Sequence, residues 1–264
     1  MPTVVVPLYI YPLPGAWDPL VLAAKANPSA QFVAIVNPGS GPGPEALPDT
    51  SYQSAIASLL TVPNIIVVGY VHCSYGARDP ATVNADIDRY AGWERASHGV
   101  LRTQGIFIDE APWDPSLRGH LAVYAHRIRS APLRLGVTPP PPPPPTPATL
   151  AAAPPRKAPL VIYNPGTVVA RGYIEDADLV VVFEQSADKF SEWFLEHGIG
   201  QIPASLRHKC VAMVHSVGGG VPGAHDVADK VRKLRLGGIY ITHQLGGGYN
   251  EWPEAWDEVV AAAS

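Results

Sequence analysis

The chain has 264 residues, of which 47% are hydrophobic and 16% charged, and its formal net charge is −4. This composition indicates a globular protein, and the length allows one barrel-type domain or two smaller domains. The acidic balance offers no basic footprint for nucleic acid, which excludes a nucleic-acid-binding class. No apolar run approaches the roughly 18 residues of a membrane-spanning helix.

The N-terminus lacks the features of a signal peptide, because Pro7 follows a short valine run with no basic segment before it. We therefore expect a cytoplasmic protein, or a secreted one whose leader has been removed. The two cysteines, Cys73 and Cys210, each lie at or near the end of an apolar run and are expected to be unpaired. No Cys/His spacing suggests zinc and no Gly-rich stretch fits a phosphate-binding loop, so we expect neither a metal nor a cofactor.

Eight apolar runs predict strands, over residues 4–11, 32–36, 65–71, 105–110, 160–163, 179–183, 211–214 and 239–242. Helices are expected over residues 17–26, 52–60, 83–98, 117–130, 187–197, 227–236 and 254–263. Asp18 is the expected N-cap of the first helix, and residues 173–177 are too short to assign. The alternation of strands and helices is typical of parallel βαβ units, and eight units of this length predict an α/β fold, a single-domain (β/α)8 TIM barrel. A doubly wound open sheet is the alternative.

A proline-rich segment interrupts this alternation at residues 138–159, with seven consecutive prolines at 139–145. Such a tract has no N–H donors and a fixed φ, so it is either polyproline II or disordered. It lies between the fourth helix and the fifth strand, which in a barrel is the face opposite the active site. We interpret it as an inserted spacer, with a ligand for an SH3- or WW-type partner as the alternative.

Polar residues follow the predicted strands at their C-terminal ends. They are Asn37, Tyr75, Asp109, Glu110, Asn164, Glu184 and His215. A barrel gathers the C-terminal ends of its strands into one mouth, whereas an open sheet spreads them along an edge. If the fold is a barrel, these residues form one site.

The three carboxylates are the candidate catalytic residues. Asp109 and Glu110 are neighbours on one strand, so their side chains should point to opposite faces and only one should be a primary catalyst. Glu184 lies two strands away, at a backbone distance of roughly 9–10 Å. Inward-leaning side chains would bring the carboxyl groups to about 5–6 Å, which fits a retaining glycosidase better than an inverting one without excluding inversion. The alternative is that these acids are N-caps or salt-bridge partners.

Aromatic residues also lie near the predicted strand ends. Those we assign to substrate binding are Tyr9, Tyr70 and Tyr75, and Trp113 and Tyr249 lie in similar positions. Flat rings beside carboxylates suit stacking on sugars, although an individual ring in such a position more often belongs to the core. Asn37, Asn164 and His215 complete the predicted substrate-binding set as hydrogen-bonding side chains, with a structural role as the alternative for His215.

Several motifs, in this order along nearly the whole chain, resemble those of the spherulin-4-like proteins, glycoside hydrolase family 135. They are Tyr9-Ile10-Tyr11-Pro12, Asn37-Pro38-Gly39-Ser40-Gly41-Pro42-Gly43, Gly69-Tyr70-Val71, Tyr75-Gly76, Tyr90-Ala91-Gly92-Trp93, Gly105-Ile106-Phe107-Ile108-Asp109-Glu110-Ala111-Pro112, Asn164-Pro165-Gly166 and Phe183-Glu184.

This resemblance implies a (β/α)8 barrel that hydrolyses α-1,4-linked polymers of N-acetylgalactosamine or galactosamine, such as fungal galactosaminogalactan. It also implies a retaining, endo-acting mechanism with Asp109 as nucleophile, Glu184 as general acid/base and Glu110 as a supporting carboxylate. Two features depart from the family pattern, namely the proline tract and His243, where an acid is expected at the end of the eighth strand. A non-catalytic carbohydrate-binding or spore or cell-wall barrel is the alternative function.

Overall fold

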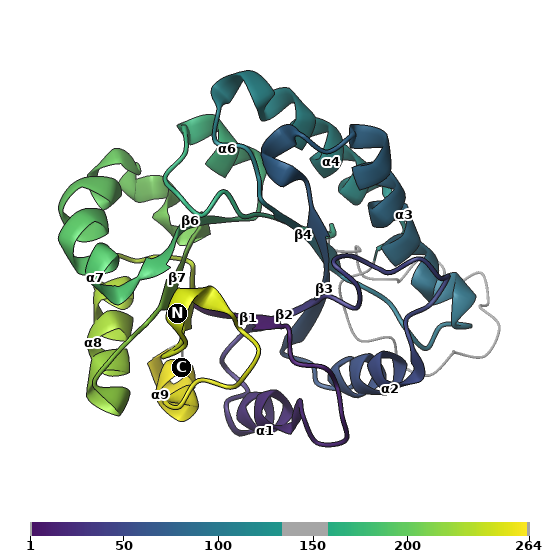
Figure 1. The fold of residues 1–264 in the computed structure, drawn as a ribbon, viewed down its shortest axis with the longest axis horizontal. Helices are drawn as coiled ribbons and strands as arrows, with labels where there is room; N and C mark the ends of the chain where they lie inside the picture. Colours follow the sequence, from purple (N-terminus) through teal and green to yellow (C-terminus); the bar gives the residue numbers. More distant parts are fainter. Residues whose placement is uncertain (1, 134–157, 263–264) are drawn as a thin grey trace, which may run out of the picture.

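The structure is a computed structural model that describes residues 2–133 and 158–262. Eight parallel strands pair in sequence order and close into one barrel, with helices arranged around it (Figure 1). The strands are β1 (Thr3–Leu8), β2 (Phe32–Val36), β3 (Ile65–His72), β4 (Gly105–Asp109), β5 (Leu160–Tyr163), β6 (Leu179–Ser186), β7 (Cys210–His215) and β8 (Gly238–Ile241). The predicted single-domain (β/α)8 barrel is confirmed. Residues 138–157 of the predicted insertion lie outside the described residues.

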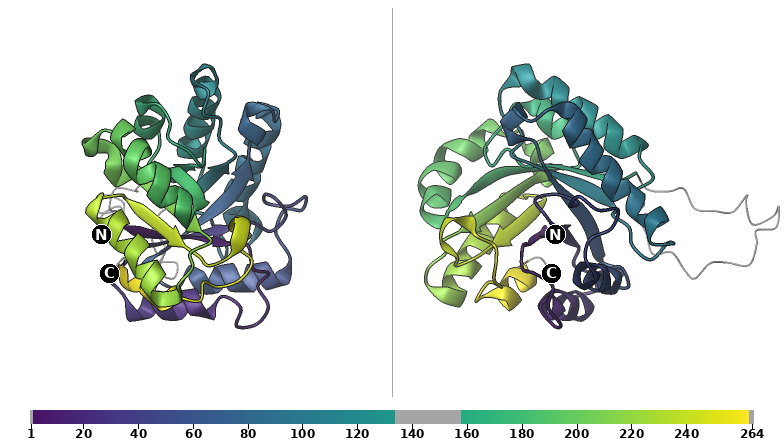
Figure 2. Two further views of the ribbon diagram at one scale, coloured as in Figure 1. Left: turned by 60° about the vertical axis from the view of Figure 1, so that its left-hand side comes forward. Right: turned by 45° about the vertical axis from the view of Figure 1, so that its right-hand side comes forward.

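Helices lie against the outer face of the barrel, as the two turned views show (Figure 2). They are α1 (Asp18–Ala26), α2 (Thr50–Leu59), α3 (Pro80–Ala96), α4 (Arg118–Ser130), α6 (Arg171–Asp176), α7 (Ala187–Lys189), the π-helix η3 (Phe190–Gly198), α8 (Gly220–Lys233) and α9 (Trp256–Ala262). Among the described residues, no helix has both the length and the apolarity needed to cross a membrane.

The strands read as continuous apolar runs because both of their faces are buried. All five residues of β2 are buried, and so are all four of β8. One face contacts the helices and the other fills the barrel interior, which is the usual environment of parallel strands. Pro7 lies inside β1 and has no N–H to donate. Val4 is the last residue of β1 that pairs with β8, so the missing N–H of Pro7 removes no hydrogen bond between these two strands. Cys73 and Cys210 are buried free thiols, as predicted.

Several predicted boundaries are wrong, each for a local reason. Asp18 is the first residue of α1 and not its N-cap, which is Trp17 without a side-chain cap. Helix α8 begins at Gly220 and not at residue 227, because Pro222 is tolerated in a first helical turn despite its poor propensity. The unassigned residues 173–177 largely fall in α6, a short helix over residues 171–176.

Strand β6 differs most from its prediction. It runs three residues past Phe183, so Glu184 lies within the strand and not at its last position. Its pairing with β7 shifts register between Val181 and Phe183, which is a β-bulge. A bulge locally bends a strand and redirects the side chains that follow it, and bulges are common beside active sites. The bulge therefore helps to set the direction of Glu184.

Candidate active site

Two carboxyl groups from different strands lie close together at the mouth of the barrel. Asp109 is the last residue of β4, and Glu184 follows the bulge of β6. The amide nitrogen Nδ2 of Asn164 donates to Asp109 Oδ1 at 2.7 Å and to Glu184 Oε2 at 2.6 Å. The two acceptor oxygens can be no farther apart than the sum of these distances, about 5.3 Å. This limit agrees with the separation of about 5–6 Å expected from strand spacing.

The Asn164-Pro165-Gly166 turn fixes the bridging amide. The Asn164 side chain is 6% exposed, and its Oδ1 accepts a hydrogen bond from the N–H of Gly166 at 3.0 Å. This bond orients the amide so that its NH₂ group faces the two acids. The carbonyl of Gly166 accepts the N–H of Glu184 at 3.0 Å, which ties the same turn to β6. One short turn after β5 therefore positions both carboxyl groups.

Two tyrosines bind the remaining carboxylate oxygens. Tyr70 donates its hydroxyl to Asp109 Oδ2 and Tyr249 donates its hydroxyl to Glu184 Oε1, both at 2.8 Å. The ring of Tyr9 lies between theirs, with centroids 5.7 Å from Tyr70 and 6.2 Å from Tyr249 in edge-to-face contacts. Each acid is thus held by the shared amide and by its own tyrosine, an arrangement that restricts both side chains.

Burial raises the pKa of both carboxyl groups, because desolvation disfavours their charged forms. Hydrogen bonds from Tyr70, from the Glu110 backbone and from Asn164 oppose this rise at Asp109, whereas only Asn164 and Tyr249 oppose it at Glu184. The negative charge of Glu110 raises the pKa of Asp109 further, and that of Asp109 raises the pKa of Glu184. Both carboxyl groups are therefore held by hydrogen-bond donors, while burial and a neighbouring negative charge favour their protonated forms.

Glu110 does not share the position of Asp109. Its backbone is left-handed, with φ of 50°, so the chain turns immediately after β4. Its carboxylate lies 3.7 Å from Nδ1 of His72, and its side chain is 39% exposed. Glu110 lies just after β4, so strand alternation does not set its direction, and the prediction that only one of the two acids is a primary catalyst stays a prediction. The structure places Glu110 beside the site, where it contacts a residue of β3.

Left-handed backbone is concentrated at this end of the barrel. Of the eight described non-glycine residues with positive φ, six follow the C-terminal ends of strands, namely Ser40, Ser74, Tyr75, Glu110, Ser216 and Tyr249. Such a conformation costs of order 1 kcal/mol for a residue with a side chain, and it persists only where the surroundings enforce it. Strain of this kind clusters at functional sites, which agrees with a site at the mouth.

Three of the predicted substrate-binding residues do not hydrogen-bond either carboxyl group within the described part of the chain. Asn37 instead accepts the N–H of Gly41 and stabilises the loop after β2. His215 lies 2.8 Å from the hydroxyl of Ser216, and burial lowers the pKa of its imidazole. Tyr75 is 49% exposed and contacts Trp113. By contrast, Tyr70 and Asn164 hydrogen-bond the acids directly, and Tyr9 packs beside them.

Tyr249 contacts the acid pair but is not among the site residues predicted from the sequence. It lies in the long connection after β8 and is 4% exposed, with its hydroxyl on Glu184. Its only sequence signal was an aromatic residue close to a predicted strand end, after three glycines. This position in the sequence does not specify which side chain the Tyr249 hydroxyl contacts.

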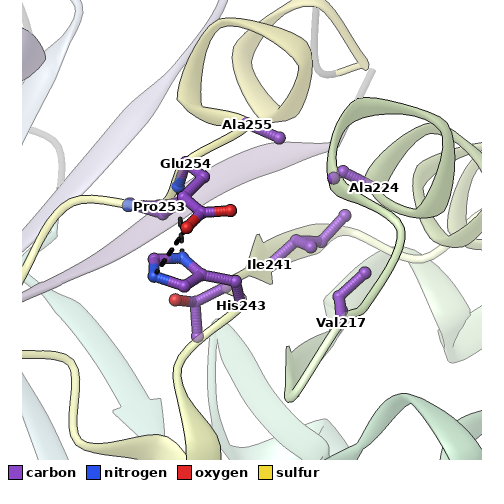
Figure 3. Close-up of a pocket in the computed structure, with 9 residues that line it drawn as sticks. Val217, Ala224, Ile241, His243, Pro253, Glu254 and Ala255 are labelled. Atoms are coloured by element: carbon purple, nitrogen blue, oxygen red, sulfur yellow. Dashed lines mark hydrogen bonds and ion pairs between the residues drawn. The ribbon is translucent and has the colours of Figure 1, made fainter.

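Acidic side chains also lie near the end of β8, although they belong to the segment before α9. Nε2 of His243 lies 3.4 Å from Glu251 and 3.8 Å from Glu254, and Nδ1 accepts the backbone N–H of Glu254. Figure 3 shows His243 turned toward Glu254 beside a small pocket between β8, α8 and the segment before α9. The pocket volume is about 10 Å³, enough for one water molecule and too small for a sugar. Among the described residues, no group of three His, Cys, Asp or Glu is placed to hold a metal ion.

A parallel eight-stranded barrel with two coupled carboxyl groups at its mouth is the arrangement of a glycoside-hydrolase-like protein. The model of the spherulation-specific family 4 matches residues 3–263, and the chain belongs to this family. The resemblance drawn from the motifs is thereby confirmed. Spherulin-4 of Physarum polycephalum is 32% identical over 249 residues, which cover 92% of this chain. The chain spans 63% of the length of that relative.

Solved structures support the same assignment. The crystal structure of Aspergillus clavatus Sph3 in complex with GalNAc is similar at a TM-score of 0.83 and 33% identity, covering 99% of this chain and 97% of that one. A Rhizomucor miehei chitinase (TM-score 0.51, 10% identity, 99% and 98% covered) and a Bacteroides thetaiotaomicron chitinase (TM-score 0.55, 12% identity, 100% and 95% covered) share the fold alone.

Proposed function

We propose that this protein is an endo-acting glycoside hydrolase that cleaves α-1,4-linked N-acetylgalactosamine or galactosamine polymers with retention of configuration. The observation that carries the proposal is that Asp109 and Glu184 both accept a hydrogen bond from the amide nitrogen of Asn164. The two accepting oxygens are therefore within about 5.3 Å of each other. A separation of ~5–5.5 Å is typical of retaining enzymes, whereas inverting enzymes keep ~6.5–9.5 Å for a water molecule.

Asp109 acts as the nucleophile in this proposal and Glu184 as the general acid/base. The carboxylate of Asp109 attacks the anomeric carbon while the protonated Glu184 transfers its proton to the leaving glycosidic oxygen. The glycosidic bond breaks and a glycosyl ester forms on Asp109. Water then attacks the same carbon, Glu184 accepts its proton, and the ester bond to Asp109 breaks.

The distribution of hydrogen bonds supports these roles. Three donors stabilise the Asp109 anion and two stabilise the Glu184 anion, which supports assigning the proton of a half-ionised pair to Glu184 in this proposal. Two titratable groups with different environments can serve as base and acid at one pH. Glu110, beside His72 and partly exposed, is suited to a supporting role at the edge of the site.

The substrate class rests on the family and on one similar structure. A. clavatus Sph3, 33% identical to this chain, was crystallised with GalNAc. In an α-linked sugar of this configuration, the 2-acetamido group is cis to the leaving group and cannot displace it from the opposite face. A nucleophile supplied by the protein is therefore required for retention, and Asp109 provides one. The aromatic rings of Tyr9 and Tyr70 offer apolar surface beside the acids.

The test is mass spectrometry of oligosaccharides released from an α-1,4-galactosaminoglycan. The wild type should release oligosaccharides, and Asp109→Asn and Glu184→Gln should each lower the rate by at least about 10³-fold. Sampling the product by NMR before it mutarotates assigns the anomer, and an α-product indicates retention. No release by the wild type, or normal release by both variants, would refute the proposal. Polymer binding without release would indicate a non-catalytic carbohydrate-binding barrel.

A further inference from the structure

Two large aromatic side chains lie exposed next to the carboxyl groups. Tyr75 follows β3 and is 49% exposed, and Trp113 follows β4 and is 56% exposed. Their ring centroids are 5.3 Å apart with an interplanar angle of 67°, so the two rings form one angled surface. Exposed aromatic surface is costly in water, and grouped rings of this kind usually mark a binding site.

The loop that presents Tyr75 is fixed to the end of β4. The N–H of Tyr75 donates to the carbonyl of Glu110 at 2.6 Å, and the N–H of Cys73 donates to the carbonyl of Asp109 at 3.0 Å. Ser74 and Tyr75 both have left-handed backbone, with φ of 46° and 53°. The strained backbone at Ser74 and Tyr75 thus holds the exposed ring of Tyr75 close to Asp109.

The loop that presents Trp113 is anchored on both sides. The N–H of Ala111 donates to the carbonyl of Asn164, the residue that bridges the two acids. The hydroxyl of Tyr173 donates to the carbonyl of Asp114 at 2.5 Å, and the side chain of Asp114 caps the 3₁₀ turn η2 (Pro115–Leu117). Trp113 therefore lies between two anchored residues, Ala111, which is held by the turn after β5, and Asp114, which is held by helix α6.

We propose that Tyr75 and Trp113 form an aromatic platform for a second sugar residue of the substrate, adjacent to the carboxyl groups on the β3–β4 side of the mouth. This inference rests on the proposed function. The apolar C–H face of a pyranose is complementary to an aromatic ring, whereas its hydroxyl groups remain in water. Desolvation raises the pKa of Tyr75, and the charges of Glu110, Asp109 and Glu184 raise it further, which agrees with a position beside the site.

The platform extends the site along the polymer. It contacts a sugar that is not being cleaved, so its contribution should appear in binding of long substrates and only weakly in the chemical step. The platform therefore favours attack inside a chain over attack on a disaccharide-sized fragment.

The experiment compares Trp113→Ala and Tyr75→Ala with a matched control, Trp193→Ala. Trp193 is also an exposed tryptophan, 40% accessible, but it lies on the outer helix η3. With an α-1,4-galactosaminoglycan, each platform variant should raise KM by roughly tenfold and change kcat by less than about threefold. Both parameters of the Trp193→Ala variant should stay near the wild-type values. Thermal unfolding of every variant verifies that the fold is intact.

Binding measurements separate this proposal from the proposed function. In the Glu184→Gln background, calorimetric titration with the polymer should show that Trp113→Ala weakens binding about tenfold, whether or not the wild type cleaves the polymer. Failure of the wild type to cleave refutes the proposed activity alone. An unchanged KM and an unchanged polymer affinity in both platform variants, or an equal loss in Trp193→Ala, would refute the platform.

Discussion

Tyr249 shows how a single hydroxyl acts on one acid of the pair. It donates to Glu184 Oε1 at 2.8 Å, whereas Tyr70 donates to Asp109 Oδ2. Hydrogen bonds of this kind stabilise the ionised carboxylate and oppose the effect of burial. Tyr249 also fixes the direction of the Glu184 side chain, so its removal should affect both the ionisation and the position of the proposed acid.

Tyr249→Phe should move the alkaline limb of the pH–rate profile to higher pH. The proposed mechanism requires protonated Glu184, and loss of the donor raises the pKa of this carboxyl further. A hydrogen bond to a charged group is worth about 1.5–3 kcal/mol, which corresponds to a shift of roughly one pH unit or more. The kcat should fall several-fold at the optimum, because Glu184 is less restricted.

The control for this measurement is Tyr11→Phe, which also removes a tyrosine hydroxyl from a carboxylate. Tyr11 donates to Asp49 at 3.3 Å, at an exposed position. Its pH–rate profile should match that of the wild type. A Tyr249→Phe profile that is lowered uniformly, with no displacement of its alkaline limb, would contradict the ionisation role.

At the residue scale, the sequence predicted the acids but not all of their partners. Asp109 and Glu184 stand out because they terminate apolar runs in a sparsely charged chain, and parallel topology brings strand ends together. Tyr249 comes from a glycine-rich connection after β8, whose path depends on tertiary contacts and not on periodicity. The role of Asn164 as a bridge was also not predictable, because only the Gly166 turn orients its amide.

Among the elements, the turn after β5 has the most direct influence on the site. Gly166 has φ of +66°, and a Cβ at this position would lie 3.7 Å from Cβ of Glu184 and 3.9 Å from Oδ1 of Asn164. A side chain here would strain the backbone of the turn that holds Asn164 and would also make van der Waals contact with Glu184 and Asn164.

Gly166→Ala should therefore destabilise the fold by about 1–2 kcal/mol and lower activity at least tenfold. Gly246→Ala is the matched control, because its φ is +67° and nothing lies within 4 Å of the added Cβ. It should show a similar loss of stability in urea unfolding with a much smaller loss of activity. Equal losses of activity in both variants would show that backbone strain alone explains the effect.

Helix α3 contributes a buried charge cluster behind the site. Asp86 accepts Arg78 Nη2 at 2.6 Å and Arg89 Nη1 at 3.3 Å, and its side chain is only 11% exposed. Arg78 also donates to the carbonyl of His72, at the end of β3. Through these contacts Asp86 connects α3 to the strand and loop that present Tyr75.

Asp86→Ala should cost about 3 kcal/mol of unfolding free energy, because it leaves a partly buried guanidinium without its carboxylate. Asp88→Ala, two residues along the same helix, removes an exposed ion pair with Arg127 and should cost much less. Urea unfolding of both variants measures the difference. Similar values for the two would mean that Asp86 contributes no more than a surface pair.

Element boundaries show where sequence patterns reach their limit. The strands were predictable because burial on both faces makes them continuous apolar runs. The start of α8 was not, because Gly220 and Pro222 have poor helix propensity and tertiary packing outweighs it. The bulge in β6 has no periodic signature, yet it helps to direct Glu184.

At the scale of the whole molecule, the buried acid pair opposes stability. The pKa of Asp109 and that of Glu184 are both raised in the folded state, chiefly by burial. A raised pKa means that the unfolded chain releases these protons at lower pH than the folded protein does. The folded state is thus most favoured at low pH, and this contribution to stability is lost as the pH rises through the folded-state pKa values. Functional groups often impose such a cost on a fold.

Glu184→Gln should therefore raise the melting temperature, and the gain should depend on pH. Below pH 4.5, the ordinary pKa of a glutamate, the unfolded chain also holds most of the proton and the variant should melt close to the wild type. Above this pH the gain should grow until Glu184 is ionised in the folded protein, and then stay constant. Asp114→Asn is the opposite control, because hydrogen bonds from Ser116 lower the pKa of Asp114 and its charge favours folding as the pH rises. Melting curves from pH 4 to 8 measure both, and a Glu184→Gln gain that is absent or independent of pH would show that the carboxylate is not destabilised by its surroundings.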